Sequence, residues 1–170
     1  MIIDNWRQYY HKEKSNYKEN QYIYYKKNGS SREVLEIVSM ESKRFGSVSE
    51  KIISKIYNLE PRTSSENDGV KQNKKIEIKC ARYWAGTDEC KWQHLEPEYD
   101  YDCVLFGLLD FNGIWNIWGI KKAMLMGELR EKKIVTYQGK QGWWCNKSKV
   151  IKYCTIIKSM SDLENFLDTI

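Results

Sequence analysis

The chain has 170 residues and a formal net charge of +5 at pH 7, with 41% hydrophobic and 30% charged residues. This length is enough for one domain with its own core. The sequence has no internal repeat and no apolar run near the ~20 residues that cross a bilayer. Because the opening MIIDNWRQYY lacks the apolar segment of a signal peptide, we expect a cytoplasmic protein with no membrane-bound part.

Charge is unevenly distributed along the chain. Residues 121–158 contain ten Lys or Arg and two acids, whereas residues 88–110 contain seven acids and one Lys. A basic segment of this kind is typical of a surface that faces a polyanion. Composition alone leaves nucleic acid and an acidic protein partner both open.

The five cysteines are odd in number, and no two of them have CxxC spacing. A zinc site drawn from Cys80, Cys90, His94 and Cys103 has a spacing that fits no common zinc pattern. We therefore expect reduced, mostly buried thiols.

The N-terminal third is predicted to be helical. Residues 4–27 are polar, aromatic and basic and predict one or two short helices, and residues 32–43 predict the next helix. A further helix is expected to begin after a glycine, with Ser47 or Ser49 as its cap. This start would place Glu50 in the first turn of that helix.

The following segment predicts a β-hairpin. A polar loop leads to a short strand near residues 68–70, a turn at residues 72–73 and a strand over residues 75–82. Period-two alternation places the apolar residues of the second strand on one face and Glu77 and Lys79 on the other.

The rest of the chain predicts more strands and a final helix. Strands are expected over residues 101–110 and 114–120, the first nearly all apolar as in a strand covered on both faces. Residues 121–133 predict a helical or irregular connection, residues 134–153 a strand–loop–strand unit and residues 159–170 a closing helix. This order predicts a single α/β domain, or the related α+β arrangement, with a central mixed sheet of four to five strands flanked by helices.

Four charged residues form the candidate catalytic site. Asp68 lies nine residues before Glu77, so closing the hairpin directs both carboxylates into the same space. Neighbouring carboxylates raise each other's pKa, and a divalent cation bound with water and phosphate oxygens removes that cost. Glu50 can add a third acid from the preceding helix. Lys79 can hold or activate an attacking water or stabilise charge on a phosphate.

This pattern resembles the PD-(D/E)xK motif of the restriction-endonuclease-like superfamily. The matching residues are Asp68, then Glu77-Ile78-Lys79, with Glu50 on the preceding helix. The resemblance covers residues 46–120, in the order acid-bearing helix, loop, acid-bearing strand, ExK strand and apolar strands. Asn67 stands where the motif often has proline.

The resemblance implies a small, magnesium-dependent endonuclease of the type II restriction class that hydrolyses phosphodiester bonds in double-stranded DNA. The implied catalytic residues are Asp68, Glu77, Lys79 and Glu50, and the three acids would hold Mg²⁺ or its substitute Mn²⁺. It also implies a homodimer with one site per strand, and a cognate DNA methyltransferase acting separately. The parts of this single nuclease domain are the helical residues 1–45, the catalytic core 46–120 and the basic residues 121–170.

The segment GKQGWWCNKSK, residues 139–149, predicts an exposed loop that touches DNA. The alternative is a loop between strands whose lysines serve only solubility. A structural role is expected for His94, and no functional role is assigned to Gln93. The predicted DNA-binding residues are Lys140, Lys147, Lys149, Trp143 and Trp144.

The aromatic residues near the N-terminus suggest where a dimer would form. We expect the dimer contact within residues 1–45, and the alternative is that these side chains pack on the chain's own sheet. The residues concerned are Trp6, Tyr9, Tyr10, Tyr22, Tyr24 and Tyr25.

Three other functions are compatible with the sequence. A repair, junction-resolving or homing-type nuclease would use the same site residues. A non-catalytic DNA-binding protein on the same fold would have no need of Asp68, Glu77 and Lys79. A protein–protein module would use the acidic residues 88–110 and would have no affinity for DNA at low salt.

Overall fold

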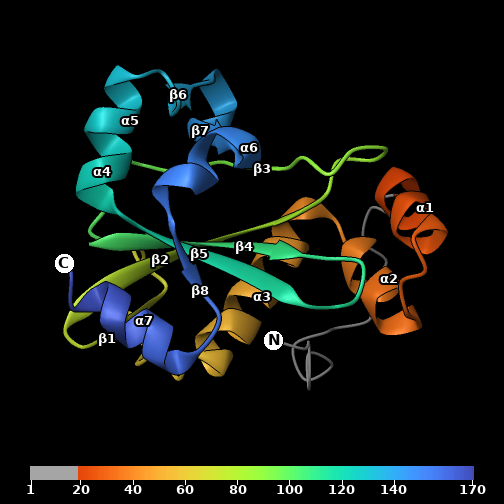
Figure 1. Ribbon diagram of the computed structural model, residues 1–170, viewed down its shortest axis with the longest axis horizontal. Coiled ribbons are helices and arrows are strands. Elements are labelled where there is room, and N and C mark those ends of the chain that lie inside the picture. Colours follow the sequence, from red (N-terminus) through yellow and green to blue (C-terminus); the bar gives the residue numbers. More distant parts are fainter. Residues whose placement is uncertain (1–18) are drawn as a thin grey trace.

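A mixed sheet of five strands forms the centre of the protein, whose computed structural model describes residues 19–170 (Figure 1). The spatial order is β1-β2-β4-β5-β8, in which β2 and β4 are parallel and the other neighbours antiparallel. This arrangement confirms the expected α/β domain with a mixed sheet flanked by helices. The strands are β1 (Gly69–Lys71), β2 (Lys74–Arg82), β4 (Cys103–Leu109), β5 (Trp115–Lys121) and β8 (Thr155–Ile157).

Helices cover one face of this sheet and bury the larger core. In Figure 1, α3 and α7 lie below the sheet, and α1 and α2 close its right-hand end. The core joins Ile76 and Ile78 of β2 to Ile52 and Ile53 of α3, as the alternation in β2 predicts. The helices are α1 (Glu19–Lys27), α2 (Arg32–Val38), α3 (Ser42–Ile56) and α7 (Met160–Leu167).

A second layer covers the opposite face of the sheet. It contains a small sheet of order β3-β7-β6 and several short helices (Figure 1). Trp92 stacks on Phe106 of β4 with ring centroids 4.4 Å apart, and its indole donates to Gly107 O at 3.0 Å. The strand β4 is therefore buried on both faces. The elements of this layer are β3 (Lys91–Trp92), α4 (Lys122–Met126), α5 (Glu128–Glu131), β6 (Thr136–Tyr137), η2 (Gly139–Gln141), β7 (Trp143–Asn146), α6 (Lys147–Val150) and η3 (Ile151–Tyr153).

The predicted boundaries of the second and third helices are wrong. α2 ends at Val38, and α3 already begins at Ser42 and runs through Gly46. The cause is a tertiary contact, because the Arg82 guanidinium donates to Val38 O at 2.7 Å and to Met40 O at 2.6 Å. These bonds satisfy carbonyls that a continued helix would have used.

The β1–β2 hairpin forms as predicted. Gln72 and Asn73 have φ values of 50° and 60°, and two successive positive φ values match the twist of a two-residue hairpin. The pairing of β1 with β2 ends at Gly69 and Ile76, so β1 does not cover the part of β2 that follows Ile76. The remaining length of β2 on that side carries no neighbouring strand within residues 19–170.

The C-terminal part differs from the prediction at two places. Residues 147–153 are helical rather than extended, and the short strand β8 was not anticipated. The closing helix α7 is confirmed, with the Ser159 hydroxyl accepting from the Asp162 N–H at 3.1 Å. Within residues 19–170, no helix has the length and apolar character that crossing a bilayer requires.

Candidate active site

Asp68 lies directly before β1, at the edge of the central sheet. Its backbone N–H donates to Ile76 O at 2.8 Å, and its Oδ2 accepts from the Ile78 N–H at 2.7 Å. Because β1 pairs with β2 only as far as Ile76, the Asp68 carboxylate takes the place that the next strand residue would have held. The hairpin therefore fixes this acid beside Glu77.

Glu77 and Lys79 point from β2 to the face that carries the second layer. The Lys79 Nζ lies 2.5 Å from Glu77 Oε1, and Glu77 as a whole is 6% exposed. A buried ion pair of this kind is costly to desolvate and is weak evidence for a purely stabilising role. Its position beside Asp68 makes the pair part of the candidate site.

Three carboxylates share this environment. Burial raises the pKa of Glu50 to about 7, with the Asp68 charge adding to the effect and Lys79 opposing it. Burial also raises the pKa of Glu77 to about 7, against the effect of Lys79 and reinforced by the charge and hydrogen bonding of Asp68. Near neutral pH the Glu50 and Glu77 carboxyls are therefore partly protonated, because burial and the Asp68 charge outweigh the attraction of Lys79.

Lys79 remains protonated in this cluster. Burial lowers its pKa, but the charge and hydrogen bond of Glu77, with the charges of Asp68 and Glu50, outweigh burial and leave the pKa above its ordinary value. A lysine with a raised pKa is a poor general base at neutral pH. Of the two predicted roles, the structure favours an ammonium that positions water or stabilises charge over a base that deprotonates water.

Two clefts meet at Glu50. The first has a volume of about 500 Å³ and the second about 630 Å³, and both are lined by Ser47 and Glu50 of α3. Asp68 lines the second cleft and Lys79 lines the first, so the catalytic candidates lie where the two clefts adjoin. An elongated substrate lying along both clefts would pass Glu50 and Asp68.

Basic and polar side chains from outside the motif line these clefts. Most of these residues were not predicted from the sequence, and Gln93 and His94 were predicted without a functional role. The first cleft includes Lys43, Trp84, Lys91, Gln93 and His94, and the second includes Lys51, Lys55 and Arg62.

The acids fit a divalent cation in their chemistry, although the ligand set is not preassembled. Among residues 19–170, no three His, Cys, Asp or Glu side chains are arranged to hold a metal ion. The reason is visible in the contacts, because Glu77 is bonded to Lys79 and Asp68 Oδ2 to the Ile78 N–H. Buried carboxylates that repel one another are the donors Mg²⁺ prefers, so Glu77, Asp68 and Glu50 would hold it once Glu77 turns from Lys79.

None of the lysines predicted to bind DNA is a lining residue of either cleft. Lys140 and Lys149 are exposed, whereas the Lys147 ammonium bonds to Asp88 O and lies 5.4 Å from the Tyr83 ring centroid. Gln141, next to Lys140, accepts from the Lys91 Nζ at 2.6 Å and thereby joins this segment to the cleft.

The two tryptophans predicted to contact DNA lie in strand β7 instead of an exposed loop. Trp143 is half-buried, with the Arg130 guanidinium 4.1 Å from its ring centroid. Trp144 is also half-buried, with the Lys91 ammonium 5.5 Å from its ring centroid. Pairing of β7 with both β3 and β6 explains why this segment is extended and anchored.

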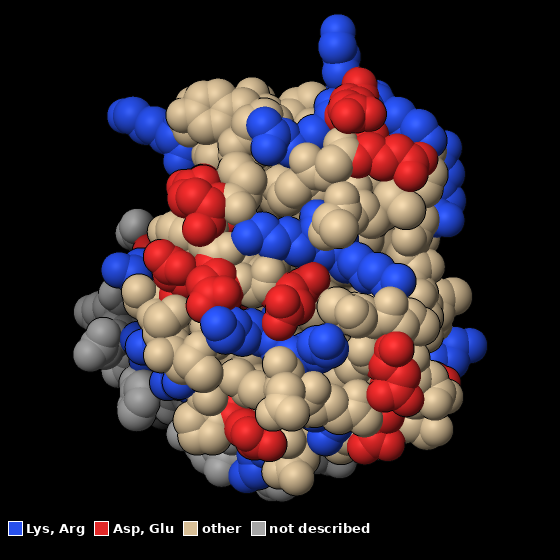
Figure 2. Space-filling model, turned by 90° about the vertical axis from the view of Figure 1, so that its left-hand side faces the viewer, with Lys and Arg blue, Asp and Glu red and all other residues tan. Residues whose placement is uncertain are grey.

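The basic C-terminal third does not form one uniform surface. Figure 2 shows the face at the left of Figure 1, where α4, α5 and α7 lie, and there Lys and Arg are interspersed with Asp and Glu. Glu128 and Lys132 pair within this region. The polyanion surface predicted from composition is therefore better sought at the clefts.

The N-terminal aromatics are only partly described. Tyr25 is fully buried, and its hydroxyl donates to Leu109 O at 2.5 Å. Tyr24 and Tyr25 both contact the Phe111 ring, so these two pack on their own domain, as the alternative interpretation expects. The predicted dimer contacts of Trp6, Tyr9 and Tyr10 lie outside the described residues.

The cysteines considered for zinc do not converge. Cys80 and Cys103 belong to the core between the central sheet and the helices α3 and α7, whereas Cys90 lies in the core between the sheet and the second layer. The sheet separates them.

A scan of the chain against protein-family models gives no match, and a search of curated proteins also gives none. The function of the site is therefore inferred from its geometry and from the order of its motif residues.

Proposed function

We propose that the protein is a metal-dependent DNA endonuclease that hydrolyses phosphodiester bonds in double-stranded DNA, and that its motif places it in the PD-(D/E)xK superfamily. The observation that carries the proposal is the meeting of Asp68, Lys79 and Glu50 at the junction of two clefts lined by basic residues, with the buried Glu77 paired to Lys79. Buried acids around a lysine, beside lysines and arginines that attract a polyanion, suit phosphodiester hydrolysis.

In this mechanism, Asp68 and Glu77 hold the metal and Glu50 assists directly or through water. When bound, Mg²⁺ supplies positive charge that stabilises the transition state and the leaving 3′-oxygen. The Lys79 ammonium donates a hydrogen bond to the attacking water and stabilises charge on the scissile phosphate. As the water oxygen bonds to phosphorus, the P–O3′ bond breaks and the proton of the water passes to solvent. The basic residues of both clefts hold the neighbouring phosphates, which provides affinity without sequence information.

We expect cleavage to require an added metal. Plasmid DNA should be cut in Mg²⁺ or Mn²⁺ and left intact in EDTA, because the uncompensated carboxylates repel both one another and the phosphate. Ca²⁺ should support DNA binding without cutting. The measurement is plasmid digestion on an agarose gel, with sequencing of the ends to reveal any recognition site. Undiminished cutting in EDTA would contradict the metal role of the three acids.

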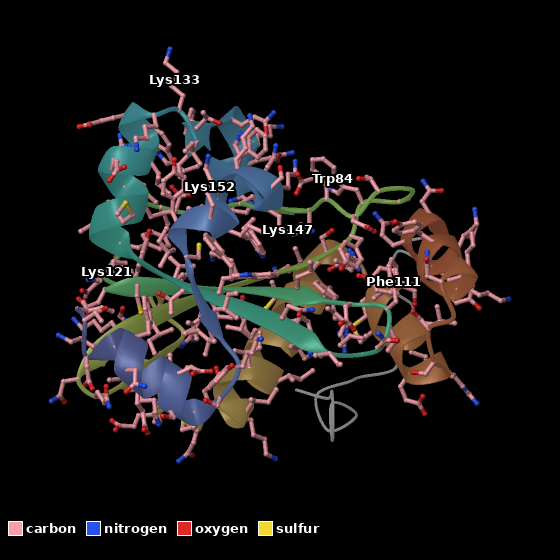
Figure 3. The ribbon with its side chains drawn as sticks, in the orientation of Figure 1. Trp84, Phe111, Lys121, Lys133, Lys147 and Lys152 are labelled. Atoms are coloured by element: carbon pink, nitrogen blue, oxygen red, sulfur yellow. The ribbon has the colours of Figure 1, made fainter. Side chains whose placement is uncertain are left out.

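We expect the exposed Lys140 and Lys149 to contribute to the salt dependence of binding. The double variant Lys140→Ala/Lys149→Ala should lower the slope of log Kd against log salt by about 1.8, since each lost contact to duplex phosphate lowers it by about 0.9. Lys133→Asn is the control. Lys133 points into solvent at the top of Figure 3, and asparagine suits its φ of 55°. An unchanged slope in the double variant would restrict the DNA surface to the clefts themselves.

A homodimer with one site per strand is part of this proposal, because a two-fold assembly matches the symmetry of duplex DNA. A repair or junction-resolving role is the second candidate. The exposed Trp84 side chain in the first cleft favours it.

A further inference from the structure

Trp84 is an exposed aromatic side chain inside the candidate active-site cleft. It is 38% exposed and lines the first cleft together with Glu50 and Lys79. Four other large hydrophobic side chains are similarly exposed within residues 19–170, and none of them lines either cleft that contains Glu50. Leaving an indole in water instead of burying it costs free energy. Its position beside the acids therefore suggests that a ligand covers it.

The loop that carries Trp84 is held in place by hydrogen bonds. The backbone N–H of Trp84 donates to Glu89 O at 2.8 Å, and the backbone N–H of Thr87 donates to Trp84 O at 3.1 Å. Asp88 Oδ1 accepts from the Tyr24 hydroxyl at 3.0 Å, and the Lys147 ammonium bonds to Asp88 O. Figure 3 places Trp84 on this loop between β2 and β3. The ring is thus presented by a fixed backbone, so little backbone freedom is lost when a ligand binds.

The Trp84 ring face is available for stacking. Among the described residues, none of the aromatic pairs and cation–ring contacts involves Trp84, although several of its neighbours in sequence and space make them. Lys43 and Lys91 line the same cleft. An aromatic platform beside cations is the arrangement with which proteins bind unpaired nucleic acid strands, because the ring stacks on a base while the cations attract phosphates.

The second cleft has a different character. Its lining includes Lys51, Lys55 and Arg62, and no aromatic residue is among its described lining residues. Such a surface contacts phosphates and does not depend on base pairing. The two clefts on either side of Glu50 are therefore asymmetric, with a stacking platform on one side only.

We propose that Trp84 stacks on an unpaired base next to the cleaved phosphate, so that the site acts where a DNA duplex opens into a single strand, as at a fork, flap or bubble. This inference rests on the proposed nuclease function. The bases of an intact duplex are stacked on one another and hide their faces, so the platform has no ligand there unless a base is extruded.

The test measures binding separately from cleavage. A labelled oligothymidylate of about 20 nucleotides, longer than a typical single-strand site, and a duplex of the same length are titrated with the full chain in Ca²⁺, and anisotropy is read. Trp84→Ala should weaken binding of the oligothymidylate by about 5- to 150-fold, the range of one lost stacked base, and leave duplex binding nearly unchanged. Trp84→Phe should restore most of the loss. Tyr137→Ala, at a 64% exposed ring outside the cleft, should have no effect.

Cleavage provides the second readout. The wild type in Mg²⁺ should cut a forked substrate about tenfold or more faster than the matched duplex, because the fork is already unpaired, and Trp84→Ala should remove this preference. Undiminished binding of oligothymidylate by Trp84→Ala, or equal losses on both probes, would overturn the stacking role even if the protein cuts DNA. Trp84-dependent single-strand binding without any cleavage would instead overturn the nuclease proposal and leave the stacking platform standing.

Discussion

Replacing Lys79 by methionine is expected to slow DNA cleavage by about 10²- to 10⁴-fold, the usual contribution of a positioned proton donor or water-orienting group. Methionine fills a similar volume but has no charge and no N–H. DNA binding, measured in Ca²⁺ to prevent cutting, should be largely retained, because the Lys79 ammonium serves the transition state more than the ground state.

The same strand offers a matched control for this experiment. Lys75 lies on the same side of β2 and also pairs with an acid, with its Nζ 2.5 Å from Asp100 Oδ2, but its side chain is 35% exposed and it lies outside both clefts. Lys75→Met should therefore cleave DNA at close to the wild-type rate. If Lys79→Met also cleaves within a few-fold of wild type, Lys79 has no part in the chemistry.

Replacing Glu50 by glutamine is expected to stabilise the metal-free protein at pH 8 and to impair cleavage. Burial, with the nearby Asp68 charge, raises the pKa of Glu50 from 4.5 to about 7 in the folded state. Between these values the folded state binds more protons than the unfolded state, so the free energy of unfolding falls as pH rises through that window. Glutamine is neutral at every pH and avoids this loss.

The size of the effect follows from the pKa shift. Since one pKa unit corresponds to 1.36 kcal/mol, the gain at pH 8 should be about 1–3 kcal/mol, or roughly 2–10 °C in Tm for a chain of this size. The gain should largely disappear near pH 4.5, where the folded-state carboxyl is protonated and the unfolded-state carboxyl is half protonated. Thermal unfolding in EDTA at the two pH values measures it.

Two further measurements complete the Glu50 experiment. Glu131→Gln, at an exposed carboxylate on α5, should leave Tm nearly unchanged at both pH values. Adding Mg²⁺ should raise the Tm of the wild type more than that of Glu50→Gln, because ligand binding stabilises the folded state according to affinity. A Glu50→Gln variant that is less stable than wild type in EDTA at pH 8 would contradict this prediction. It would show that neighbouring groups stabilise the Glu50 charge in the folded state.

The convergence of Asp68, Glu77 and Lys79 was predictable because it depends on local rules. The turn at Gln72 and Asn73 sets the hairpin register, and the two-residue period of a strand sets the side of β2 on which the charged residues lie. These rules depend on neighbours within about ten residues, so a single sequence contains them.

Other parts of the site depend on tertiary contacts that a sequence does not display. The helix that carries Glu50 was predicted to begin several residues late, because the carbonyls that end α2 are satisfied by Arg82 from another element. Lys91 reaches the cleft through β3, a two-residue strand that exists only by pairing with β7 some fifty residues further on. Trp84 lies on a loop with no periodicity to indicate its direction.

The early end of β1 affects how the protein behaves among its own copies. Beyond Ile76, one edge of β2 lacks a neighbouring strand among the described residues, and an unpaired edge can recruit a strand from another molecule and start aggregation. Here the edge is guarded by the Asp68 carboxylate, which occupies the Ile78 N–H, and by the buried charges of Glu77 and Lys79 next to it. The unpaired edge of β2, which is accessible from the clefts, is thus protected from pairing with other molecules by the same acids that we propose for catalysis. Neutralising these acids would remove the bond to the Ile78 N–H and the buried charges together.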